Sequence, residues 1–233
     1  MPVCFNNLQF PENMIPTLKD LLQQLNWLPL EAGVLAFFIT GSALVLIRDW
    51  RVSVGALALQ YLALGFALSR LVRPEVAFAK VLVGLFISLM LYLSARQSGW
   101  RRQPGGLRTL LGQRSVAGEA FPPGRAFRLM ALLLVAVSAI SMSQTYLIAP
   151  LPAAASIAVY WLIMIGLLIL VLSENPLKAG QGLFTALAGF ELWFTTTEGS
   201  LLVMGLLGGV GLLLALTTGY LAAIRGVARE EDF

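Results

Sequence analysis

Two charged residues lie inside segments that are otherwise apolar. Lys80 belongs to the stretch AFAKVLVGLFISLMLYLSARQ, residues 77–97, and Glu191 belongs to the segment 177–195. A charge at the centre of a bilayer costs about 2.5–3.5 kcal/mol on insertion scales, so such residues usually face a partner or a polar path between helices. Lys80 and Glu191 are therefore the first candidates for an ion pathway.

Two uncharged polar residues lie near the middle of apolar segments. Gln60 is central in the segment 51–70, and Thr185 is central in the segment that also holds Glu191. Both side chains can hold water, which makes them further ion-pathway candidates. The alternative is a plain hydrogen bond between two helices.

The residue types needed for most catalysis are missing from the sequence. The chain has no histidine and a single cysteine, Cys4. This excludes histidine-bound haem, zinc or copper, an iron–sulfur cluster held by this chain alone, and an intrachain disulfide. Phosphate-binding loop motifs are absent too. We expect no enzymatic activity, no cofactor and no metal site.

The glycine-rich stretch GLLGGVG at 205–211 lies within an apolar segment. In that setting glycine lets two helix backbones approach closely and does not form a phosphate cradle. We expect Gly208 and Gly209 to make a tight helix contact.

Composition identifies the environment of these residues. Of the 233 residues, 58% are hydrophobic and 12% are charged, whereas soluble domains carry about 25% charged residues. The chain is therefore expected to be an integral membrane protein whose main surroundings are the lipid bilayer. Its excess of basic residues relates to topology, because no basic stretch interleaved with stacking aromatics indicates nucleic-acid binding.

The apolar segments predict an all-α, polytopic fold with about seven transmembrane helices. They lie at 31–47, 51–70, 75–95, 128–148, 153–173, 177–195 and 199–224. Before them, residues 1–30 have leucines at helical spacing and lack the basic start of a signal peptide, so an amphipathic helix in the membrane interface is expected. A helix packed on a neighbouring subunit is the alternative.

Arginines predict the orientation in the inner membrane. The loop 96–127 is rich in arginine, which is typical of a cytoplasmic loop, whereas the connection IAPLPAAAS at 148–156 is uncharged. Seven helices with an outside N-terminus place that loop and the tail 225–233 in the cytoplasm.

An internal repeat is also predicted. A shift of 125 residues aligns Gly41 with Gly166, Gly55 with Gly180 and Gly84 with Gly209. The three-helix half 31–95 then matches the half 153–224 in parallel orientation, and the segment 128–148 becomes a linker helix.

The predicted topology allows Lys80 and Glu191 to meet. Both fall at a similar depth towards the outer side, so they could pair across the two halves and lower the cost of burying each charge. Alternatively, Lys80 extends to the interface or pairs with Glu75. Charged residues at the inner helix ends are expected to be surface anchors; they are Arg48, Asp49, Arg51, Glu174 and Lys178.

Three stretches carry a resemblance to a known family. DWRVSVGALALQYLALGFALS (49–69) and AKVLVGLFISLMLYLSAR (79–96) are similar to the second and third spans of component E of hydrogenase-4 and formate-hydrogenlyase-type complexes. LLILVLSENPLKAGQGLFTALAGFELWF (167–194) resembles a later segment of that family and the K-type subunit of respiratory complex I.

The resemblance implies a subunit between a redox module and antiporter-like subunits, where charged residues in the membrane couple redox chemistry to ion movement. The third-span lysine of the family corresponds to Lys80. The glutamate that K-type subunits place soon after the matching glycine is missing, because Leu183 to Leu187 are not acidic and the first acid after Gly182 is Glu191.

Three functions remain open at this point. The chain could be a non-catalytic membrane subunit of such a complex, with other membrane subunits as partners. It could also be a small stand-alone secondary transporter, or a purely structural subunit of another membrane complex. A transporter would be expected to show broken helices with paired polar groups at the midplane.

Overall fold

The computed structural model describes residues 29–47, 49–97, 124–173, 175–197 and 200–231. Within these ranges every regular element is a helix. The helices are α2 (Leu30–Leu46), α3 (Trp50–Leu71), α4 (Pro74–Gln97), α5 (Arg125–Thr145), α6 (Ala153–Val171), α7 (Pro176–Thr197) and α8 (Leu201–Glu231). The amphipathic helix predicted for 1–30 and most of the loop 96–127 lie outside the described residues.

Five of these helices are long and apolar enough to cross a membrane, namely α3, α4, α5, α6 and α8. The helix α2 is apolar but has only 17 residues. The helix α7 has 22 residues, but its lysine, glutamine, glutamate and threonines lower its hydropathy. The chain therefore has the all-α fold of a membrane protein. Compared with the five helices that could cross a membrane, α2 is shorter and α7 is less apolar.

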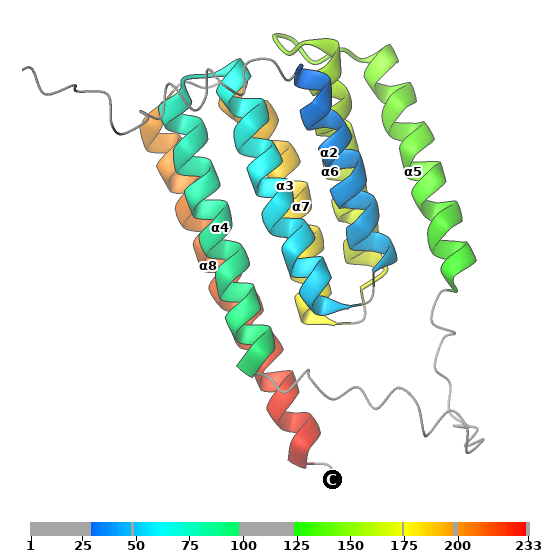
Figure 1. Ribbon diagram of the computed structural model, residues 1–233, viewed down its shortest axis with the longest axis vertical. Coiled ribbons are helices and arrows are strands. Elements are labelled where there is room, and N and C mark those ends of the chain that lie inside the picture. Colours follow the sequence, from blue (N-terminus) through cyan, green and yellow to red (C-terminus); the bar gives the residue numbers. More distant parts are fainter. Residues whose placement is uncertain (1–28, 48, 98–123, 174, 198–199, 232–233) are drawn as a thin grey trace, which may run out of the picture.

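The helices form two stacked layers with one helix at the edge (Figure 1). One layer is α2, α3 and α4, and the other is α6, α7 and α8. Each helix of the first layer packs on its counterpart in the second: α2 on α6, α3 on α7 and α4 on α8. The predicted linker helix, α5, packs on α6 and α2 outside the two layers.

The two ends of the bundle carry different parts of the chain. The C-terminal end of α4, the N-terminal end of α5 and the C-terminal end of α8 lie at the lower end in Figure 1. We call it the loop end, because the arginine-rich loop connects α4 to α5 in the sequence. The connection between α5 and α6 lies at the opposite end. The segment predicted as a tail from 225 differs in structure, since α8 continues as a helix to Glu231.

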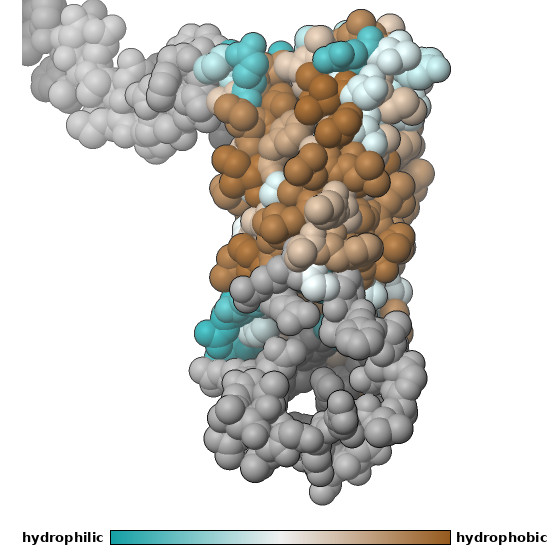
Figure 2. All heavy atoms as spheres, turned by 90° about the vertical axis from the view of Figure 1, so that its right-hand side faces the viewer, coloured by the Kyte–Doolittle hydropathy of each residue, from teal (hydrophilic) through white to brown (hydrophobic). Residues whose placement is uncertain are grey.

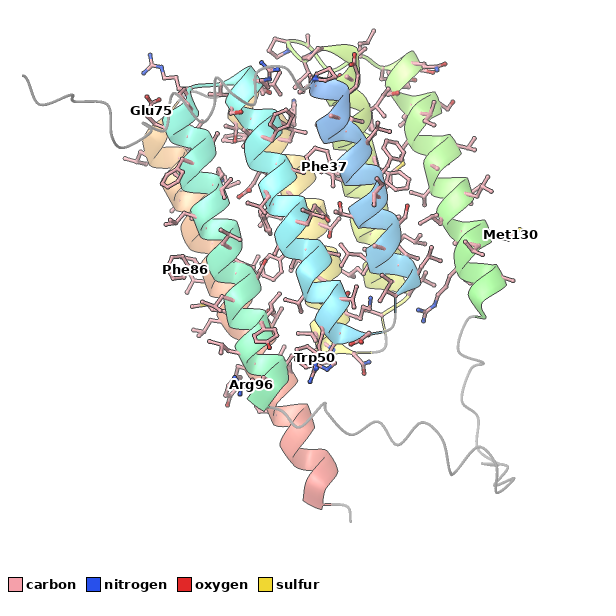
Figure 3. The ribbon with its side chains drawn as sticks, viewed as in Figure 1. Phe37, Trp50, Glu75, Phe86, Arg96 and Met130 are labelled. Carbon is pink, nitrogen blue, oxygen red and sulfur yellow. The ribbon has the colours of Figure 1, made fainter. Side chains whose placement is uncertain are left out.

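Large apolar side chains occupy both the interior and the outer surface. Phe37 and Trp161 are buried, and the Trp161 indole nitrogen donates a hydrogen bond to the Phe37 carbonyl oxygen at 3.0 Å. Phe86 and Met130 point away from the bundle and are exposed (Figure 3). Apolar residues cover the middle of the face shown in Figure 2, with hydrophilic residues towards its ends. Such a surface suits a lipid environment, in which apolar side chains need no further cover.

Glycines bring α6 and α7 into close contact. A Cβ atom added at Gly182 would lie 2.8 Å from the Gly166 carbonyl oxygen and 2.8 Å from the Leu170 nitrogen. One added at Gly189 would lie 2.9 Å from the Leu162 Cβ atom. The absence of side chains at these positions therefore lets the two backbones pack directly, as small residues commonly do between membrane helices.

Candidate polar seam between α3, α4 and α7

Lys80 and Glu191 form a buried ion pair. The Lys80 Nζ atom lies 2.7 Å from the Glu191 Oε1 atom, and each side chain is only 5% exposed. The contact predicted from the sequence is thus present. The alternatives for Lys80 are wrong, because it does not extend to the interface and Glu75 is exposed at the end of α4 (Figure 3).

The ion pair lies within a group of four helices. Lys80 is on α4, which packs mainly on α3 and α8, and Glu191 is on α7, which packs on α6, α8 and α3. The two side chains therefore meet in the space enclosed by α3, α4, α7 and α8. This placement shields both charges from lipid, and their pairing offsets part of the cost of burial.

Tyr61 adds a buried hydroxyl next to this pair. Its ring occupies the space where a Cβ atom of Gly84 would lie, and Gly84 is one helical turn after Lys80 on α4. Tyr61 is 2% exposed, and its hydroxyl has no hydrogen-bond partner among the described residues. Tyr61 was not among the predicted site residues. The glycine one turn from Lys80 was the available signal, because it leaves room for a large side chain.

Gln60 and Thr185 are both fully buried. Neither amide atom of the Gln60 side chain has a partner in the described part of the chain. The Thr185 hydroxyl donates to the Gln181 carbonyl oxygen of its own helix at 2.8 Å. Within the described residues, neither side chain makes the inter-helix hydrogen bond that was the alternative explanation.

A second polar group lies at the loop end of α7. The Lys178 ammonium donates to the carbonyl oxygens of Leu44 at 2.6 Å and Ile47 at 2.9 Å, and to the Ser53 hydroxyl at 3.0 Å. Ser53 donates in turn to the Gln181 Oε1 atom at 2.6 Å. An ammonium has three donors, so these acceptors satisfy Lys178 completely.

The prediction that Lys178 is a surface anchor is therefore wrong. The C-terminus of α2 carries carbonyl oxygens without intrahelical partners, and a lysine is a suitable group to bind them. Asp49, predicted in the same way, accepts from the Arg51 backbone nitrogen at 3.1 Å and caps α3. Arg48 and Glu174 lie outside the described residues.

The predicted packing glycines of α8 are only loosely covered within this chain. A Cβ atom at Gly208 would meet Val83 at an ordinary 3.5 Å, and one at Gly209 would meet nothing within 4 Å among the described residues. Among the described residues, the glycines that bring two helix backbones into direct contact are instead those between α6 and α7. A contact of Gly208 and Gly209 with another subunit stays a prediction.

We call the set Lys178, Ser53, Gln181, Gln60, Thr185, Tyr61, Lys80 and Glu191 the polar seam. In the part of the chain that the structure describes, no group of three or more His, Cys, Asp or Glu side chains could hold a metal ion. The chemistry of the polar seam is that of paired charges, hydroxyls and amides.

Comparison with known proteins yields no assignment. No protein-family model, no curated protein and no solved structure matches the chain.

Proposed function

We propose that this chain is a non-catalytic membrane subunit of a complex I-like or group 4 hydrogenase-like assembly, in which it contributes to ion coupling between redox and antiporter-like modules. The observation that carries the proposal is the buried Lys80–Glu191 pair. Membrane proteins rarely bury ionisable residues in this way unless the residues serve an ion path or a specific contact.

The resemblance to component E of hydrogenase-4 supports the same role. In that reading Lys80 is the third-span lysine of the family, and Glu191 supplies the acid that the K-type pattern would place earlier on the same helix. Gln60 and Thr185 continue the polar path towards the loop end. The partners are other membrane subunits of the complex.

A stand-alone transporter is the second candidate. The stacked layers α2–α4 and α6–α8 support it, because many transporters are built from two related halves, and the predicted repeat would relate these layers. Against it, α3, α4, α6, α7 and α8 are continuous helices in the described residues, whereas transporters commonly bind substrate at broken ones.

We propose the inner membrane as the location, with the N-terminus outside and the loop end in the cytoplasm. The arginines of the loop support this orientation. A cysteine placed at Gln103, in a chain whose Cys4 is changed to serine, should not react with an impermeant thiol reagent in intact cells. Labelling of that cysteine would show that the chain has the opposite orientation in the membrane.

The experiment that tests the proposed function is mild purification of the tagged full chain from its own host. We expect redox and antiporter-like membrane subunits in stoichiometric amounts, identified by mass spectrometry. The same preparation from a Lys80→Met strain should show lower ion coupling per electron transferred. A full chain that purifies alone and transports a solute in vesicles would support the transporter instead.

A further inference from the structure

Two cations share the C-terminal end of α2 at the loop end of the bundle. Lys178 on α7 binds the carbonyl oxygens of Leu44 and Ile47. Arg128, in the first turn of α5, donates from its Nη1 atom to the carbonyl oxygen of Val45 at a long 3.5 Å. The two side chains are close enough for their positive charges to repel each other. The fold thus brings two basic residues of distant segments to one helix end.

Arg128 keeps donors that the protein does not use. A guanidinium group has five N–H donors. Among the described residues Val45 supplies its one acceptor, and the buried Nε atom has none. The residue is half-buried and remains accessible. Because the planar fork of arginine matches the oxygens of phosphate groups, these free donors suit an oxyanion.

The negative charge around this pair of cations is too small to balance it. The C-terminal end of a helix such as α2 carries only about half a negative charge. Asp49 lies close in sequence, but it caps α3 and forms no ion pair with either cation in the described part of the chain. The positive end of the α5 dipole also lies at the loop end (Figure 1). An excess of positive charge therefore remains here.

An apolar surface begins directly beside Arg128. Phe127 and Leu134 on α5 are 57% and 69% exposed, and Met130 points away from the bundle (Figure 3). Leu134 comes six residues after Arg128, about 9 Å further along the helix. The helix α5 is long and apolar enough to cross a membrane, so its first turn lies towards the headgroup level. A molecule bound here meets a cation at one end and hydrocarbon along its length.

We propose that Arg128 and Lys178 form a binding site for the phosphate of an anionic phospholipid, whose acyl chains lie along the exposed apolar side of α5. Arg128 donates to the phosphate oxygens. Lys178, whose three donors already have acceptors, contributes its charge. Basic groups between membrane helices are known to bind anionic headgroups in this way. The site concerns the lipid around the chain and is independent of the complex to which the chain belongs.

Quenching by brominated lipids can test the site in the full chain. A fluorophore is attached to Leu134→Cys, with Cys4 changed to serine, in bilayers of phosphatidylglycerol and phosphatidylcholine of which one is brominated. Phosphatidylglycerol should bind beside Leu134 about five-fold more strongly, the contribution of one basic side chain. Leu206→Cys is 64% exposed on α8 towards the other end of the bundle and should show no preference. Equal binding of both lipids at Leu134 would overturn the inference.

Three charge variants test whether Arg128 causes the preference. Arg128→Gln should abolish it, whereas Arg128→Lys keeps the charge without the planar fork and should keep part of it. Arg96→Gln removes an exposed arginine at the same end of the bundle (Figure 3) and should leave the preference intact. An equal loss in Arg128→Gln and Arg96→Gln would indicate general attraction to a basic surface and overturn the site. If Arg128→Gln does not fold, the comparison of the two fluorophore positions still decides.

Two other anions could occupy the same place. Inorganic phosphate, added at constant ionic strength, should not displace phosphatidylglycerol, because the acyl chains hold the lipid at α5. Displacement would show that the site takes free phosphate and would overturn the assignment to a lipid. Glu174, which lies outside the described residues, is the alternative within the chain. Glu174→Gln should leave the preference unchanged, and a preference that appears only in this variant would show that the carboxylate fills the site.

Discussion

The two sides of α7 differ in how they are held against their neighbours. Towards α6, Gly182 and Gly189 let backbone pack on backbone, and the contact is apolar and tight. Towards α3 and α4, the same helix presents Gln181 and Glu191, which bond Ser53 and Lys80. One side is stabilised by close packing and the other by hydrogen bonds and charge.

This difference shows why a helix of modest hydropathy can lie inside a membrane protein. Lipid does not meet the polar side of α7, because α3, α4 and α8 surround it. The dry contact with α6 fixes the position of the helix, and the polar contact can then hold charges at a defined distance. The substitutions below alter either the polar side or the glycine side of α7. Each is compared with a substitution at another position of the chain.

The largest effect is expected from breaking the ion pair. Lys80→Met or Glu191→Gln leaves the other charge buried without a partner, which costs about 3–5 kcal/mol. Unfolding of the purified chain in detergent should show this loss, and the exchanged variant Lys80→Glu with Glu191→Lys should recover part of it. Glu75→Gln removes an exposed carboxylate at the same end and should leave stability unchanged. An exchanged variant no more stable than either single change would contradict the pairing.

The dry side of α7 should be sensitive to a single methyl group. In Gly182→Ala the new Cβ atom meets backbone atoms of α6, which cannot move independently, so we expect a loss of about 1–3 kcal/mol from overpacking. Gly209→Ala makes the same change where the described residues leave open space. It should be neutral or stabilise by up to about 1 kcal/mol, because alanine favours helix over glycine. Equal stability of the two variants would show that the α6–α7 contact is looser than the structure indicates.

The loop-end group should give an intermediate effect. Lys178→Met leaves the Leu44 and Ile47 carbonyl oxygens without their donor, and a lost bond to a charged group contributes about 1.5–3 kcal/mol. Ser53→Ala keeps both carbonyl bonds and should cost less. Hydrogen exchange at the C-terminal turn of α2 should rise in Lys178→Met and change little in Ser53→Ala. Unchanged exchange in both would mean that Lys178 does not hold this helix end.

The smallest effect on the chain itself is expected at the exposed glycines of α8. Gly209→Leu adds a side chain into open space and should leave unfolding of the isolated chain unaltered. If a partner helix packs there, the same variant should weaken the assembled complex on native gels, and Gly208→Leu should do so as well. If the complex stays intact with each of these two variants, this surface of α8 does not contact a partner subunit.

Much of the fold follows from the order of apolar and polar residues. Long apolar segments separated by short polar ones predict membrane helices, because a backbone in lipid must satisfy its own hydrogen bonds. The predicted segments agree with the observed helices to within a few residues, except that α8 extends beyond 224. Lys80 and Glu191 were recognisable as candidates because a charge in an apolar segment is costly wherever it lies.

The tertiary structure alone decided which polar residues share one seam. Lys178 looks like a surface charge in the sequence, since lysines near helix ends commonly are. Only the position of the α2 C-terminus beside it makes it a partly buried cap of that helix. Tyr61 resembles any aromatic residue of an apolar span until Gly84 is seen to make room for it. Gly182 and Gly209 look alike in the sequence, yet one lies against a backbone and the other faces open space among the described residues. Local patterns determine which segments become helices, because helix formation depends on neighbouring residues, whereas the partner of each side chain depends on how distant helices pack.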